Sequence, residues 1–113
     1  MKLKIDVTSF NKNAWNREVE KGNEWIIPVT PDRISEARIG NFKILLTPTK
    51  PVPPAWFPSL EGCHFLCLAS GGGQQGPLLA AVGAKVTVFD NSPRQLDQDR
   101  LVAAREKLEM TTV

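Results

Sequence analysis

The sequence predicts an α/β fold built on a parallel sheet, and three observations support this prediction. From Cys63 onward, short apolar runs alternate with helix-like runs. A glycine-rich stretch separates the first such strand from the first such helix, and the second strand ends on an acid, Asp90. This β-α-β-α order is typical of parallel strands joined by crossover helices. We therefore expect a parallel sheet with helices on its faces, preceded by an N-terminal helical segment.

Residues 1–62 predict this helical segment, followed by one strand and a proline-rich connector. A helix is expected from Phe10 to Lys21, with Gly22 as its C-terminal stop. A second helix is expected to begin with Thr30 as the N-cap and Pro31 at the first helical position, where a missing N–H costs nothing. Gly40 closes this second helix.

The stretch from Asn41 to Thr47 has the aliphatic character of a strand. Its unbroken run Ile44-Leu45-Leu46 does not alternate with polar residues, which predicts burial on both faces. Five prolines between residues 48 and 58 then exclude regular structure up to Leu60. We expect Trp56 and Phe57 to pack this connector onto the rest of the fold.

Residues 63–113 are expected to form the first βαβα units of a nucleotide-binding domain. The expected elements are a strand over Cys63–Ala69, a helix over Pro77–Val82, a strand over Lys85–Phe89, a helix over Pro93–Leu108 and a third strand over Met110–Val113. The last helix has a capping box, with Ser92 as N-cap and Gln95 at the third helical position. Its inner face is expected at Leu101, Ala104 and Leu108.

The glycine-rich loop carries the functional signal. Gly71, Gly73 and Gly76 satisfy the pattern G-x-G-x-x-G, and Asp90 follows Gly71 by 19 residues, at the tip of the next strand. Glycines let a ligand approach the main chain, and a strand-tip acid can accept hydrogen bonds from both ribose hydroxyls. A phosphate-binding P-loop is excluded because no Gly-Lys-Ser or Gly-Lys-Thr follows. The alternative is a purely structural turn, in which Asp90 caps the loop or the next helix.

Register distinguishes the two nucleoside ligands that remain, a dinucleotide such as NAD and S-adenosylmethionine. In a dinucleotide site the first glycine ends the strand, whereas here Ala69 and Ser70 intervene, which favours S-adenosylmethionine. The segment resembles class I S-adenosylmethionine-dependent methyltransferases, whose first motif runs acidic, apolar, Gly-x-Gly-x-Gly. On that motif Cys67 stands at the acidic position, Ala69 at the first glycine, and Gly71 and Gly73 at the others.

Asp90, within Val-Phe-Asp-Asn-Ser-Pro, resembles the second motif of the family, which places an acid on the ribose. The likeness extends to methyltransferase-like proteins that carry the loop "LASGGGQQGP", and to the N-terminal stretch from Trp25 to Pro58. Because Cys67 is not acidic and Ala69 replaces a glycine, one polar contact near the methionine amine is missing. Either Gln74 and Gln75 supply polar contacts instead, or they are simply exposed glutamines at a helix N-terminus. The resemblance implies the following cofactor-binding residues and no identifiable catalytic residue: Ala69, Ser70, Gly71, Gly73, Gln74, Gln75, Asp90, Asn91 and Ser92.

The resemblance implies a Rossmann-like methyltransferase fold with a truncated sheet, since family members have seven strands and this chain matches their first half. The expected function is the S-adenosylmethionine-binding part of a methyltransferase that acts on a small molecule, incomplete for catalysis by itself. The alternatives are a non-catalytic methyltransferase-like module and an NAD-binding oxidoreductase fragment. The unpaired edge of the strand Cys63–Ala69 predicts a homodimer or a swapped assembly.

Composition limits the remaining possibilities. The 113 residues are 42% hydrophobic and 23% charged with a net charge of +2, and they contain no long apolar run or signal peptide. We therefore expect a cytoplasmic protein without membrane or nucleic-acid partners, whose Trp15, Trp25 and Trp56 have packing roles. Cys63 and Cys67 share one face of a strand roughly 13 Å apart, too far for a disulfide. With one histidine and no Cys-x-x-Cys, no metal site is expected.

Overall fold

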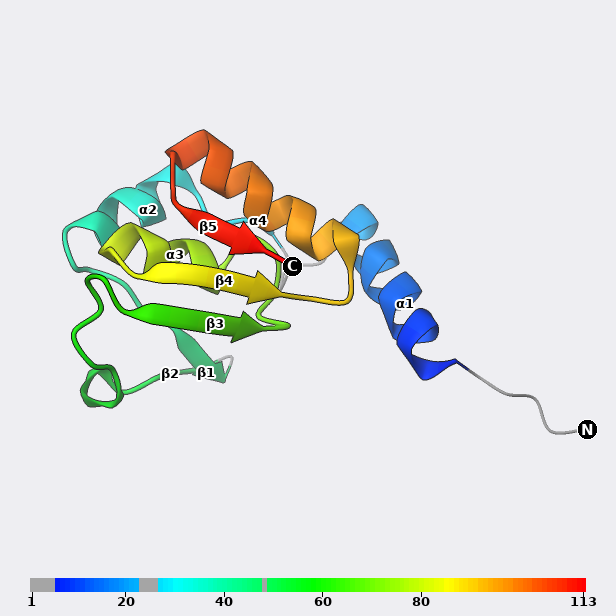
Figure 1. Cartoon of the computed structure of the whole chain (residues 1–113), viewed down its shortest axis with the longest axis horizontal. Coiled ribbons are helices and arrows are strands. Elements are labelled where there is room, and N and C mark those ends of the chain that lie inside the picture. The colour runs from blue at the N-terminus through cyan, green and yellow to red at the C-terminus, as the bar shows by residue number, and fades with distance from the viewer. Residues whose placement is uncertain (1–5, 23–26, 48) are drawn as a thin grey trace, which may run out of the picture.

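The structure is a computed structural model that describes residues 6–22, 27–47 and 49–113. Helices α2, α3 and α4 gather against a three-stranded sheet, whereas α1 projects beyond the ends of the strands (Figure 1). No helix within the described ranges is long and apolar enough to cross a membrane. The helices and strands are α1 (Val7–Lys21), α2 (Pro31–Arg38), β1 (Leu45–Thr47), β2 (Lys50–Pro51), β3 (His64–Leu68), α3 (Gln75–Val82), β4 (Lys85–Phe89), α4 (Pro93–Glu106) and β5 (Met110–Thr112).

The expected parallel sheet is confirmed. Its strand order is β3-β4-β5, and both pairings are parallel, with Cys67 opposite Val88 and Val88 opposite Thr112. The third strand predicted from Met110 is therefore real. The order places β4 at the centre and β3 at one edge of the sheet. The fold is a mixed α/β arrangement compatible with a Rossmann-like one.

Helices cover one face of this sheet. Cys67, Val86 and Val88 point to the covered face, where they pack against Leu79 of α3 and Leu96 of α4 in one buried cluster. Crossovers between neighbouring parallel strands are right-handed, so two successive crossovers in one direction place both helices on the same side. The expectation of helices on the faces of the sheet is therefore wrong for the second face, as far as the described residues extend.

The other face of the sheet is bare and apolar. Leu66, Leu68 and Phe89 are 62%, 65% and 53% exposed, and the pairing of Leu68 with Phe89 makes the last two neighbours on that face. Large apolar side chains gathered on one surface mark an interaction site or an aggregation hazard. Because β3 also forms an edge of the sheet, its outer backbone groups adjoin this apolar face.

The buried face of α4 differs from the predicted one. Leu101 is 55% exposed and Ala104 is exposed, so the prediction that they face the core is wrong. The buried stripe consists of Leu96, Asp99 and Val102, which follow one another at intervals of three residues. The positions of the apolar residues did not predict the buried face of α4, because that face includes the carboxylate of Asp99.

Capping residues set the helix boundaries mostly as predicted. Thr30 accepts a hydrogen bond from the backbone of α2, and Gly22 ends α1 with a positive φ of 71°. Helix α1 begins three residues earlier than expected because Asp6 is its N-cap, accepting from the Ser9 N–H at 3.2 Å. Helix α4 ends two residues early because Lys107 adopts a left-handed conformation, with a φ of 54°.

The strand predicted over 41–47 is reduced to β1, and its burial on both faces is wrong. All three residues of β1 are exposed, and the strand pairs antiparallel with β2, so it does not join the parallel sheet. Regular structure was also excluded too broadly in the connector, which contains β2 and a short 3-10 helix over Pro54–Trp56. Proline is compatible with an edge strand and with a helix start, since neither position needs its N–H.

The aromatic residues that the sequence predicts to pack differ in how far they are exposed to solvent. Phe57 is half-buried and lies between Phe42 and Phe65, with ring centroids 6.2 and 6.3 Å away. Trp56 is 66% exposed, so its predicted packing role is wrong. Trp15 is half exposed on α1. Trp25 lies outside the described residues.

Residues on both sides of Gly62 share the interior. Ile34 and Ala37 of α2 are buried in one cluster with Leu78 of α3 and Val102 of α4. Helix α1 contributes no buried residue. The segment that contains α2 is thus held by apolar packing, whereas α1 has to be held by other contacts.

Candidate functional site

The loop between β3 and α3 turns through three residues in the left-handed region. Ala69 has a φ of 46°, Gly71 of 77° and Gly73 of 76°. This conformation costs an L-residue with a Cβ about 1 to 2 kcal/mol, whereas glycine adopts it freely. Ala69 therefore stands at a position where the backbone favours glycine.

Two N–H groups of the loop are bound from inside the protein. The Gly72 N–H donates to Gln95 Oε1 at 2.6 Å, and the Gly73 N–H donates to Asp99 Oδ1 at 2.9 Å. Both acceptors lie on α4 and are almost fully buried, with 3% and 1% exposure. Helix α4 therefore holds the loop through these two hydrogen bonds, and the two N–H groups are not directed at a ligand.

Asp99 places a carboxylate beneath the loop. Burial raises the pKa of Asp99 to about 6, an effect that the Gly73 N–H partly offsets and the charge of Asp90 increases. Its Oδ2 is buried without a hydrogen-bond partner among the described residues. The pKa of the nearby Cys67 thiol is raised, first by burial and then by the charge of Asp99. The interior next to the loop therefore holds an acidic group whose charged form burial disfavours.

The tip of β4 carries Asp90 and Asn91, and both make structural contacts. Asp90 Oδ1 accepts from the Ser92 N–H at 2.8 Å. Asn91 Nδ2 donates to the Thr8 carbonyl at 2.8 Å, a contact that joins α1 to the loop after β4. Asp90 thus caps its own loop, as the structural alternative supposed, and it still lines the cavity described below.

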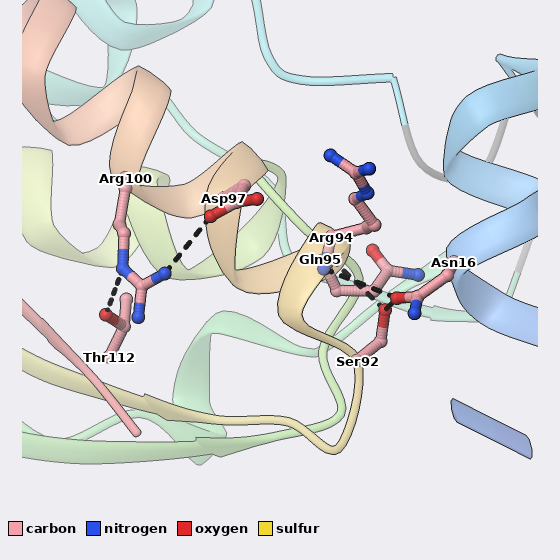
Figure 2. Close-up of polar contacts among 7 residues, drawn as sticks. All are labelled: Asn16, Ser92, Arg94, Gln95, Asp97, Arg100 and Thr112. Carbon is pink, nitrogen blue, oxygen red and sulfur yellow. Dashed lines mark hydrogen bonds and ion pairs between the residues drawn. The ribbon is translucent and has the colours of Figure 1, made fainter. Parts of the chain in front are cut away.

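Polar contacts hold α1 against the start of α4 (Figure 2). Asn16 Oδ1 accepts from the Ser92 hydroxyl at 2.6 Å and from the Arg94 N–H at 3.4 Å. Ser92 is also the N-cap of α4 and accepts from the Gln95 N–H at 3.3 Å. The capping box is therefore half formed, because the Gln95 side chain binds the glycine loop and does not turn back to Ser92.

A cavity of about 720 Å³ lies between α1, the glycine loop and the tip of β4. This volume is within the range of small-molecule sites. Apolar walls come from Val7 and Trp15 of α1 and from Phe89. The remaining lining residues, mostly polar or backbone-exposing, are Thr8, Asn11, Ala69, Gly71, Asp90, Asn91, Gln95 and Val113.

The nine predicted cofactor residues fall into three groups. Ala69, Gly71, Asp90 and Asn91 line the 720 Å³ cavity. Gln74 and Gln75 line a different cavity, on the side of residues 27–33. Ser70, Gly73 and Ser92 line neither cavity: the first two belong to the loop itself, and Ser92 is the N-cap of α4.

Residue-level reasoning missed the contribution of α1 and the buried acceptors of α4. Asp99 could have been found, because an acid three residues from both Leu96 and Val102 lies on their helix face. No sequence signal points to Trp15 or Asn16, since their partners are far away in the chain. Only the packing of α1 brings them to this site.

Comparison with known proteins relates the chain to a bacterial protein. No family model matches this chain. The chain is 53% identical over 107 residues to the uncharacterized methyltransferase YbaJ of Bacillus subtilis (strain 168), and the match covers 95% of this chain. It covers 42% of that protein, so the chain spans less than half the length of the curated relative it matches.

Proposed function

We propose that this chain is the S-adenosylmethionine-binding part of a methyltransferase with a Rossmann-like fold, acting on a small molecule. The description of the B. subtilis relative supports the reaction class. The order of strand, glycine loop, helix and strand-tip acid supports a nucleoside ligand. The 720 Å³ cavity brings the loop and that acid together.

The observation that carries this proposal is that two N–H groups of the glycine loop are already bound by α4. A pyrophosphate binds best to free backbone N–H groups at such a loop, yet Gly72 and Gly73 donate to Gln95 and Asp99 on α4. Burial raises the pKa of Asp99 to about 6. In its ionised form this carboxylate beneath the loop disfavours the pyrophosphate of NAD and favours the sulfonium and ammonium charges of S-adenosylmethionine.

In the proposed complex the ribose hydroxyls donate to Asp90, and the backbone at Ala69 and Gly71 adjoins the methionine end. Trp15 and Phe89 supply apolar surface for the purine. Methyl transfer requires an acceptor atom held in line with the sulfonium methyl group. We propose that the groups which hold it come largely from polypeptide outside the 107 matched residues.

Replacing Asp90 is expected to weaken S-adenosylhomocysteine binding by about 10- to 150-fold, which corresponds to roughly 1.5 to 3 kcal/mol for a charged acceptor lost to two hydroxyls. Asp90→Asn is the sharper variant, because its Oδ1 can still accept from the Ser92 N–H and keep the loop in place. Asp90→Ala removes both the acceptor for the ribose hydroxyls and the acceptor for the Ser92 N–H. Calorimetric titration with S-adenosylhomocysteine and with NAD measures the effect.

Asp97→Asn is the matched control, since it removes the same charge from an exposed side chain that does not line the cavity. This control should bind as the wild type does. Tighter binding of NAD than of S-adenosylhomocysteine, or an Asp90→Asn protein that binds with unchanged affinity, contradicts the proposal.

We also propose that the isolated chain self-associates through β3. Its unpaired edge and the bare face with Leu66 and Leu68 together offer backbone groups and apolar surface to a second copy. Sedimentation analysis should show a dimer at high micromolar concentration. The double variant Leu66→Glu, Leu68→Glu should shift it toward monomer, whereas Leu101→Glu, at an exposed leucine on α4, should not. A clean wild-type monomer at high concentration is the contrary result.

A further inference from the structure

A second cavity, of about 440 Å³, lies between α3, residues 27–30 with the start of α2, and strand β1. Gln74, Gln75 and Leu78 belong to its α3 side, and no residue is shared with the lining of the cavity that contains Asp90. Ala69 and Gly71 therefore line the Asp90 cavity, whereas Gln74 and Gln75, farther along the same segment, line this second cavity. We refer to this second space as the α2–α3 cavity.

The charged side chains that line the α2–α3 cavity are all positive. Arg33 and Lys43 line it, and its lining contains no acidic residue. Neither cation forms an ion pair with any described residue, in contrast to Arg94 and Arg100, which each pair with a carboxylate. Two cations that line one cavity, without a neutralising acid from the described parts of the chain, favour an anionic ligand.

The backbone adds to this positive field. Helices α2 and α3 both begin at the cavity, where Thr30 and Gln75 line it. A helix N-terminus carries a partial positive charge, and α3 has no side chain bound to its first N–H groups. The Gln74 amide is already used, donating to the Ile27 carbonyl at 3.1 Å. Gln75 makes no side-chain hydrogen bond with a described residue, so its amide is available to a ligand.

The other walls of the cavity are apolar and accessible. Ile27, Leu45 and Leu46 line it and are 54%, 45% and 55% exposed. The run Ile44-Leu45-Leu46, which the sequence placed in a doubly buried strand, thus presents two leucines to this space. Apolar surface of this extent next to a cationic wall suits a ligand that has both an apolar body and an anionic group.

We propose that the α2–α3 cavity binds a small amphipathic anion, with its carboxylate or phosphate at Arg33 and Lys43 and its apolar body against Ile27, Leu45 and Leu46. Gln75 and the start of α3 complete the anion site. This proposal does not depend on the ligand of the Asp90 cavity, because the two linings are separate.

The test uses four probes on the whole chain: octyl phosphate, octanoate, octylammonium and inorganic phosphate. Titrations followed by amide NMR should show saturable shifts at Arg33, Gln75 and Leu78 with the first two probes. Octylammonium and inorganic phosphate should bind at least about ten-fold more weakly, since the first carries the opposite charge and the second has no apolar body. The comparison of octyl phosphate with octanoate shows which anionic group the cavity prefers.

The variant Arg33→Gln, Lys43→Gln should weaken octyl phosphate binding about ten-fold, an effect of the size expected for two exposed charge contacts. Its matched control is Lys12→Gln, Arg17→Gln, which removes the same charge from α1, outside both cavity linings. Equal binding of octylammonium, equal binding by both double variants, or shifts centred on Leu66 and Leu68 would overturn the proposal. None of these results depends on S-adenosylhomocysteine.

Discussion

Replacing Gly72 by alanine should destabilise the protein by about 3 kcal/mol or more, because the new methyl group has no space. A Cβ at Gly72 would clash with the Gln95 carbonyl oxygen and would lie 2.8 Å from both Gln95 Oε1 and Gln98 Cβ. The obstacle is the backbone of α4, which cannot move aside without losing its packing on the sheet. The substitution also disturbs the 2.6 Å bond from the Gly72 N–H to Gln95.

Gly62→Ala is the matched control for this prediction. Gly62 has a φ of +73°, and a Cβ there meets nothing within 4 Å. Its substitution should therefore cost only the strain of a left-handed residue, about 1 to 2 kcal/mol. Urea denaturation gives both free energies of unfolding. Equal losses in the two variants would show that α4 does not press on the loop as described.

Asp99→Asn should remove a pH dependence of stability worth about 3 kcal/mol. The pKa of Asp99 is raised from 3.8 to about 6 in the folded chain. Between these values the native state keeps a proton that the unfolded state has lost, so this residue lowers the free energy of unfolding as pH rises. The penalty is absent below about pH 4 and complete above about pH 6.

The free energy of unfolding of Asp99→Asn relative to the wild type should rise by about 3 kcal/mol between pH 4 and pH 7.5. Asparagine still offers Oδ1 to the Gly73 N–H, so the loop contact is preserved. Asp97→Asn, exposed on the same helix and paired with Arg100 at the surface, should change stability by less than about 1 kcal/mol at either pH. A difference for Asp99→Asn that does not vary with pH would mean that the carboxylate is not desolvated in the native state.

The sequence by itself determined the local elements of this protein and their order. Caps such as Thr30 and Ser92 act over three residues, so the starts of α2 and α4 could be predicted from neighbouring residues. The alternation of strand and helix after Cys63 was enough to predict parallel pairing of β3, β4 and β5. The glycine loop and the strand-tip position of Asp90 follow from the same order.

Only the tertiary structure decided which residues meet at the two cavities. Asn91 contacts Thr8 across 83 positions, and Ser92 contacts Asn16 across 76, so no local pattern could place α1 at the Asp90 cavity. The orientation of α4 also depended on packing, since burial of Asp99 beneath Gly73 overrides the apolar stripe that the sequence suggested. Local hydrogen bonds and propensities extend over a few residues, whereas the direction of a helix face and the division of one loop between two cavities arise when distant segments share a core.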